Sequence, residues 1–532
     1  MPGSWNEQFQ DTRDYLGMAW YVRETYVPQG WKGQIICLRV GSANYAARVW
    51  INGTFVGEHY GGHLPFACEV TQQVAWDKPN TIAIQVENEL TPTRVPPGNV
   101  QRRGLGGFMR GYPSTNFDFF PYAGLHRPVI LYTVPQVHIE DVTVVTEIEQ
   151  GDGIVKVKVV QRGGSAAGQL SLSGESGTLE SALTFTDGLA EATIRVSHAR
   201  LWCPEDPYLY KLTVSLTEGD QVIDRYGLDV GVRTIAVDGD KLLLNGKPIF
   251  MKGFGKHEDF PVHGRGLNMP LVVKDYALLR WVGANSYRTS HYPYSEEAMQ
   301  MADRQGVLVV DEIPAVGLFF EDGEKNIQTR LRQCKQQICE LIARDKNHPS
   351  VIMWSVANEP MPSSFIRRFT GGGEEGDGDA AATAFFTELY DLTHELDPTR
   401  LATSAAVMGG PVEWMALSDV VFINRYWGWY THSGQLDAGA EALAQELDAL
   451  HKTLNRPIVI SEFGAGTIGR PAQRPARDVD RGIPGRVSSP LPGPGDGAAF
   501  CRRPARLEFR RFQDRAIGQA PWGPEPERRV HP

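Results

Sequence analysis

The sequence has few cysteines and no long apolar segment. Six cysteines occur without CxxC or Cys/His ligand spacing: Cys37, Cys68, Cys203, Cys334, Cys339 and Cys501. This scatter argues against a disulfide framework and a metal site, so we expect reduced packing residues. No apolar run is long enough to cross a bilayer, so no membrane span is expected. The first residues, MPGSWNEQFQDTRDY, lack a basic segment followed by an apolar stretch, which predicts no secretory signal and a cytoplasmic location.

The chain also has fewer basic than acidic residues. The chain has 63 Asp and Glu against 53 Lys and Arg, a formal net charge of −10. This balance disfavours nucleic acid and anionic membranes as partners. A small acidic ligand stays open, because recognition of such a molecule is local.

The first 234 residues have the alternating pattern of short antiparallel strands. Runs within 1–133, such as YVRETYVP, GQIICLRV, AARVWING and NTIAIQVENEL, predict a β-sandwich. Only a polar turn precedes them, so we expect this sandwich to need a further strand at its N-terminal end. Runs from about 134 up to DVGVRTIAV (229–237) predict an immunoglobulin-like β-sandwich, to which we assign residues 134–234.

From about 235 to 469, strands alternate with helical patterns, which is typical of a parallel α/β fold. Seven strands are predicted: PIFMKGFG (248–255), ANSYRTS (284–290), GVLVVDE (306–312), VIMWSVANE (351–359), LATSAAV (401–407), DVVFINRY (419–426) and PIVISEFG (457–464). Helical periodicity at 329–345 and 439–455 falls between them. The pattern predicts a (β/α)₈ TIM barrel that lacks its last strand.

Glu359 and Glu462 lie near the C-terminal ends of two of these strands, in MWSVANEP (353–360) and IVISEFGA (458–465). A buried parallel strand delivers such a residue to the C-terminal mouth of a barrel, where catalytic groups gather. Two carboxyl groups that face one another across the sugar are the smallest set of catalytic groups that most glycosidases use to break a glycosidic bond. For a single strand-end glutamate a rim salt bridge is the better interpretation; the shared context of Glu359 and Glu462 favours catalysis.

Longer motifs extend from the first sandwich to the end of the barrel: DFFPYAGLHR (118–127), GFGKHED (253–259), ANSYRTSHYPY (284–294), ELIARDKNHPSVIMWSVANEP (340–360), LDPTR (396–400), INRYWGWY (423–430) and SEFGA (461–465). Together they resemble the β-glucuronidases of glycoside hydrolase family 2. The resemblance implies that the sandwich of residues 1–133 is a jelly-roll-like, sugar-binding domain. It also implies that Glu359 is the general acid/base and Glu462 the nucleophile of a retaining, double-displacement mechanism.

The resemblance also implies seven substrate-binding residues: Asp118, Arg288, His291, Asn358, Asn424, Tyr426 and Tyr430. Asn358 would bind the sugar 2-hydroxyl, Tyr426 would orient the nucleophile, and Asp118 would reach the distal hydroxyls from the first sandwich. Arg288 would hold the nucleophile ionised and His291 would bind hydroxyls. Structural interpretations stay open: capping for Asn358 and Asp118, and core packing for His291 and the tyrosines.

The pattern changes after Ile468. Residues 470–532 contain thirteen Arg, eleven Pro and no Lys, without strand or helix periodicity. A natural basic tail is one interpretation. We favour a shifted reading frame, because a one-base step converts 475–484 to PPEMWTEEY, 507–512 to WNFADF and 524–531 to LNRKGVFT, each of which resembles a family segment. WNFADF would be the eighth barrel strand, and the Asn-x-Lys pair of LNRKGVFT would clamp the sugar carboxylate, so the printed chain is expected to be feebly active or inactive.

The leading interpretation is an exo-acting β-glucuronidase that needs no metal or cofactor and forms a homo-oligomer when correctly folded. The alternative within the family is a β-galactosidase or β-mannosidase, which INRYWGWY and SHYPYSEE disfavour. The alternative outside the enzymes is a non-catalytic carbohydrate-binding protein. The presence of both Glu359 and Glu462 argues against this non-catalytic alternative, and the missing eighth strand argues for it.

Overall fold

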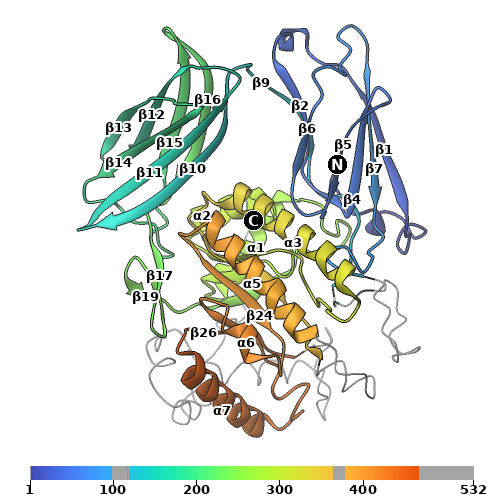
Figure 1. Cartoon of the computed structure of the whole chain (residues 1–532), viewed down its shortest axis with the longest axis vertical. Helices are drawn as coiled ribbons and strands as arrows, with labels where there is room; N and C mark the ends of the chain where they lie inside the picture. The colour runs from blue at the N-terminus through green and yellow to red at the C-terminus, as the bar shows by residue number, and fades with distance from the viewer. Residues whose placement is uncertain (1, 99–114, 116, 118, 364–377, 466–532) are drawn as a thin grey trace, which may run out of the picture. The chain divides into compact units, whose positions relative to one another are not determined.

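The computed structural model describes most of the chain: residues 2–98, 115, 117, 119–363 and 378–465 (Figure 1). The chain divides into two units. One unit consists of Met1–Asn424 with Arg456–Ser461, and the other consists of Arg425–Asn455 with the chain from Glu462 onward.

The first sandwich is built from antiparallel strands (blue in Figure 1). Its strands are β1 (Met18–Thr25), β2 (Ile35–Val40), β3 (Ala43–Asn44), β4 (Ala46–Ile51), β5 (Thr54–Tyr60), β6 (Phe66–Glu69), β7 (Asn80–Glu87), β8 (Gly124–Leu125) and β9 (Val129–Val134), with 3-10 turns η1 (Trp5–Glu7) and η2 (Gln29–Trp31). The two main sheets have the orders β1-β7-β4-β5 and β6-β2-β9. Alternate residues of β2, such as Ile36 and Leu38, are buried, as a strand with one core-facing side requires.

The second sandwich follows directly. Its strands are β10 (His138–Glu149), β11 (Asp152–Arg162), β12 (Ala167–Gly174), β13 (Gly177–Leu183), β14 (Leu189–Val196), β15 (Tyr210–Glu218) and β16 (Gln221–Val230). They form two antiparallel sheets of orders β10-β11-β14 and β13-β12-β15-β16. Valines of β11, such as Val155, Val157 and Val159, face leucines of β12 in one hydrophobic core.

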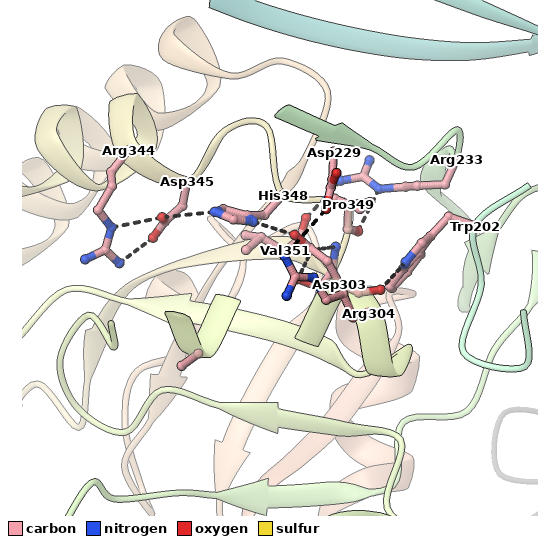
Figure 2. Close-up of polar contacts among 12 residues, drawn as sticks. Trp202, Asp229, Arg233, Asp303, Arg304, Arg344, Asp345, His348, Pro349 and Val351 are labelled. Atoms are coloured by element: carbon pink, nitrogen blue, oxygen red, sulfur yellow. Dashed lines mark hydrogen bonds and ion pairs between the residues drawn. The ribbon is translucent and has the colours of Figure 1, made fainter. Parts of the chain in front are cut away.

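One predicted strand, DVGVRTIAV, is wrong as a single element. Strand β16 ends at Val230, and β17 (Ile235–Asp238) starts a separate small sheet with β18 (Lys241–Leu244) and β19 (Lys247–Pro248). Gly231 lies against the next domain, since an added Cβ would stand 2.7 Å from the Cβ of Pro349. Arg233 Nε donates to Pro349 O at 3.1 Å and its Nη2 donates to Val351 O at 2.8 Å (Figure 2). These tertiary contacts, which no local pattern encodes, end the strand.

The third part is a parallel barrel sheet with strands in sequence order. The strands are β20 (Gly253–Gly255), β21 (Ser286–Arg288), β22 (Leu308–Glu312), β23 (Val351–Asn358), β24 (Leu401–Ala406), β25 (Val421–Asn424) and β26 (Ile458–Glu462). The helices are α1 (Met269–Trp281), α2 (Glu296–Gln305), α3 (Glu324–Asp345), α5 (Gly378–Leu396), α6 (Val412–Met415) and α7 (Leu436–Leu454). Each of the seven predicted strand segments contains one observed strand. All residues of β22 and β23 are buried, as expected for strands covered on both faces.

A polar network joins the second sandwich to the barrel around Asp303 (Figure 2). The indole Nε1 of Trp202 donates to the main-chain oxygen of Asp303 at 2.8 Å, and His348 Nδ1 lies 2.5 Å from Asp303 Oδ2. On its other side, His348 Nε2 is 3.9 Å from Asp345 Oδ1. Burial alone would lower the pKa of His348, but the carboxylates of Asp303 and then Asp345 outweigh burial and raise it.

His348→Gln is expected to lower the free energy of unfolding by about 3 kcal/mol near pH 6, because it removes one partner of a buried ion pair. A raised pKa contributes stability that is fully present below the unfolded value of about 6.5 and is lost as the pH rises through the higher folded value. Urea unfolding at pH 6 and pH 9 measures the effect, and the advantage of the parent protein should shrink at pH 9. A double-mutant cycle with Asp303→Asn isolates the interaction energy of the His348–Asp303 pair. A difference in the free energy of unfolding between parent and variant that does not change with pH would contradict the ion-pair account.

Candidate active site

Asn358 and Glu359 stand at the carboxyl end of β23. Main-chain hydrogen bonds fix both residues: Asn358 N donates to Ala315 O at 3.0 Å, and Glu359 N donates to Ala405 O at 2.8 Å. Glu359 has a left-handed φ of 46°. This conformation is uncommon for residues other than glycine and persists where the surroundings enforce it, often at functional sites. The barrel thus holds Glu359 in one backbone conformation.

Asn424, at the end of β25, connects these two side chains. Its Nδ2 donates to Glu359 Oε1 at 3.0 Å and to Asn358 Oδ1 at 3.1 Å. The hydroxyl of Ser461 donates to Asn424 Oδ1 at 2.7 Å. Because the amide oxygen accepts from Ser461, the amide nitrogen is the group that faces Glu359. Two barrel strands therefore orient one carboxyl group.

A buried ionic cluster around Glu312 adjoins this pair. Arg288 Nη1 donates to both carboxylate oxygens of Glu312, at 2.8 and 2.7 Å, and His291 Nδ1 lies 2.8 Å from Oε1. Ser355 Oγ donates to Oε2 at 2.6 Å. Burial alone would raise the pKa of Glu312, but Arg288 first, and then His291 and Ser355, lower it to about 2. Arg288 Nη1 also donates to Asn358 Oδ1 at 3.4 Å, which links the cluster to the strand end.

Glu462 lies in the second unit, at the end of β26. The hydroxyl of Tyr426 donates a short hydrogen bond to Glu462 Oε2, and Arg425 N donates to Glu462 O at 2.9 Å. A donor aimed at a carboxylate favours its ionised form. The ring of Tyr426 lies 5.1 Å from that of Tyr430, which is 69% exposed. This arrangement suits a carboxylate that must stay charged beside an accessible aromatic surface.

The structure thus places the residues expected from the sequence in two groups. The first unit brings together Glu359, Asn358, Asn424, Arg288 and His291. The second unit joins Tyr426 to both Glu462 and Tyr430. Asp118 and the segment 470–532 lie outside the described residues, so their expected roles stay predictions.

Sequence reasoning missed Glu312. The signal was present, because GVLVVDE ends in two acidic residues within a strand that is otherwise apolar. A carboxylate buried at such a position must be paired or protonated. Its partners come from β21, the segment after it and β23, and this convergence is a property of the folded barrel.

Neither a metal cluster nor a membrane-spanning helix is found in the described part of the chain. Among residues 2–98, 115, 117, 119–363 and 378–465, no group of three or more His, Cys, Asp or Glu side chains is arranged to hold a metal ion. Within the same ranges, no helix is long and apolar enough to cross a membrane.

Three family models match the chain in succession. They describe the sugar binding domain of glycosyl hydrolases family 2 at residues 5–135, glycosyl hydrolases family 2 at 137–233, and the family 2 TIM barrel domain at 235–474. The β-glucuronidase of Canis lupus familiaris is 40% identical over 494 residues, which cover 88% of this chain and 72% of the canine protein. The chain belongs to glycosyl hydrolase family 2.

One further relative and two solved structures, all named β-glucuronidases, match a similarly large share of this chain. The β-glucuronidase of Paenibacillus borealis is 37% identical over 488 residues, covering 88% of this chain and 78% of that protein. The structure of a β-D-glucuronidase for Dictyoglomus thermophilum has a TM-score of 0.79 at 36% identity, covering 92% of this chain and 83% of the other. The Ruminococcus gnavus β-glucuronidase in complex with D-glucuronic acid has a TM-score of 0.81 at 33% identity, covering 92% and 81%. The predicted fold, two β-sandwiches followed by a TIM barrel, is confirmed, and the chain is a family 2 glycosidase.

Proposed function

We propose that this protein is a retaining exo-β-glucuronidase in which Glu359 donates the proton and Glu462 is the nucleophile. The observation that carries the proposal is the placement of Glu359 at the end of a family 2 barrel strand, with its carboxyl group held by Asn424. The relatives reported above are named β-glucuronidases, and one structure contains D-glucuronic acid. These names favour a β-D-glucuronide over a β-galactoside or β-mannoside as the substrate.

The reaction has two displacements. In the first, Glu359 gives its proton to the glycosidic oxygen while Glu462 attacks the anomeric carbon, so the aglycone leaves and a glycosyl-enzyme ester forms. In the second, Glu359 takes a proton from water, which attacks the same carbon and releases glucuronate with its original configuration. This sequence requires carboxyl groups about 5–5.5 Å apart. Side chains supply every proton transfer and the nucleophile.

Neighbouring groups support these two roles. The Tyr426 hydroxyl, which donates to Glu462, would keep the nucleophile ionised until the sugar binds. The amide of Asn358 would bind the 2-hydroxyl, a contact that strengthens as the ring flattens in the transition state. Arg288, His291 and Tyr430 would contact the sugar directly or hold those groups. Asp118 and a homo-oligomeric state belong to the same proposal and rest on the family resemblance.

A panel of aryl β-glycosides tests the substrate. The glucuronide is expected to be cleaved in preference to the galactoside and the mannoside, with proton NMR showing β-glucuronate as the first product. The assay uses the full chain at high concentration and a version with the reading frame corrected after residue 469. Preference for a neutral sugar, or an α-configured first product, would exclude a retaining β-glucuronidase. Absence of hydrolysis in both versions would favour a carbohydrate-binding role.

A further inference from the structure

Glu312 has a complete set of partners inside the barrel and no role in the two displacements. Its side chain is fully buried, and its carboxyl contacts among the described residues are Arg288, His291 and Ser355. A carboxylate in that position cannot reach solvent and is stabilised by the cation of Arg288. The pairing is reciprocal, because the same contacts fix the positions of Arg288 and His291.

The contacts of Arg288 extend this effect to the strand end. Arg288 Nη1 donates to Asn358 Oδ1 at 3.4 Å, and the same oxygen accepts from Asn424 Nδ2 at 3.1 Å. Asn424 Nδ2 in turn donates to Glu359 Oε1 at 3.0 Å. A continuous series of hydrogen bonds therefore runs from Glu312 to the carboxyl group of Glu359, through side chains that come from four different barrel strands or their ends.

We propose that Glu312 is a positioning residue that orients Arg288 and His291 and neutralises the charge of Arg288, which hydrogen bonds through Asn358 and Asn424 connect to Glu359. The inference rests on the proposed function, in which Glu359 must carry a proton at the start of the reaction. An unbalanced guanidinium that hydrogen bonds connect to that carboxyl group would favour its ionised form. Glu312 therefore keeps Glu359 protonated to a higher pH without touching the substrate.

The charged and titratable groups around the cluster come from several elements. They are Arg288 of β21, His291, His257 (whose ring lies 5.6 Å from that of His291), Glu359 and, beside Glu312 on β22, Asp311 with Asp345 and Arg344 of α3. Burial, and then Asp345, raise the pKa of Asp311 well above its usual range. This shift favours the protonated form of Asp311, and Glu312 is the carboxyl group that contacts the Arg288 guanidinium among the described residues.

Glu312→Gln removes the charge and keeps the size of the side chain. We expect kcat/KM for an aryl β-glucuronide to fall by about 100-fold, the scale of a misplaced active-site group. We also expect the alkaline limb of the pH–rate profile to move to lower pH by about one unit, because the unbalanced cation of Arg288 favours loss of the proton from Glu359. Glu312→Asp keeps the charge and is expected to keep the parental pH profile, even where its rate falls.

Asp311→Asn is the matched control. Asp311 is adjacent on the same strand and equally buried, with Oδ1 accepting from Thr289 Oγ1 at 3.1 Å. Because burial and Asp345 favour the protonated form of Asp311, its replacement by Asn preserves the size of the side chain and perturbs the charge of the cluster less than Glu312→Gln does. Its kcat/KM is expected to stay within about twofold of the parent, with an unchanged pH profile.

The rates are measured on the full chain and on the frame-corrected version, and a crystal structure of Glu312→Gln is determined in parallel. Displacement of Arg288 and His291 in the variant, together with the shifted profile, supports the inference. If Glu312→Gln and Asp311→Asn lose the same factor in kcat/KM and neither shifts the pH–rate profile, Glu312 only supports the fold. If neither parent cleaves a glucuronide, the proposed function fails, and the crystal structure still decides the inference: Arg288 and His291 in unchanged positions overturn it.

Discussion

In the protein with its reading frame corrected after residue 469, Glu462→Gln is expected to lower kcat/KM for an aryl β-glucuronide by at least about 1,000-fold, and Glu359→Gln by a similar factor. The two losses differ in origin. Without Glu462 no glycosyl-enzyme can form, because Gln has no carboxylate to attack the anomeric carbon. Without Glu359 the ester can still form when the aglycone is an activated phenol that leaves without a proton.

Mass spectrometry of the intact protein after mixing with a dinitrophenyl glucuronide separates the two variants. Glu359→Gln is expected to gain the mass of one glucuronosyl group, and Glu462→Gln is expected to gain none. Glu413→Gln, an exposed glutamate on α6, serves as the control and should keep the parental rate. Rapid labelling of Glu462→Gln, or equal labelling of both variants, would reverse or refute the assignment.

Correcting the reading frame after residue 469 is expected to raise glucuronidase activity strongly. The corrected sequence restores the segment that resembles the eighth barrel strand and the Asn-x-Lys pair that resembles the family's carboxylate clamp. Each charge-assisted hydrogen bond to the sugar carboxylate contributes about 1.5–3 kcal/mol, which corresponds to a rate factor of about 10 to 150. Recovery of the eighth strand should add to this by closing the barrel behind the catalytic groups.

Measuring kcat/KM for the printed and the frame-corrected chains side by side determines this gain in activity. The gain should be large for the glucuronide and small for the galactoside, because only the glucuronide has a C6 carboxylate for the clamp. Replacing the restored Lys by Met in the corrected chain gives a control that keeps the strand and loses the charge. Full glucuronidase activity of the printed chain would show that the frame-shift interpretation of its last 63 residues is wrong.

The sequence by itself determined the order of the domains and the strands that deliver both glutamates. Runs such as VIMWSVAN and IVISE are apolar and β-branched, and a buried parallel strand needs little more than that local pattern. Strands β23 and β26 were therefore predicted, with Glu359 directly after the first and Glu462 as the last residue of the second. The alternating pattern of residues 134–234 also predicts the second sandwich, even though β12 and β13 contain Gly and Ser, which weaken a strand pattern.

Only the tertiary structure decided which side chains meet. The break after Val230 depends on packing of Gly231 against Pro349, more than 100 positions away along the chain. The hydrogen bonds from Asn424 to Glu359, and the cluster around Glu312, likewise join side chains from different strands. Periodicity reports how a residue relates to its near neighbours, whereas hydrogen bonding and charge pairing in a barrel depend on which strand ends converge. The sequence could therefore name the two catalytic candidates, while the fold specified the groups that hold them.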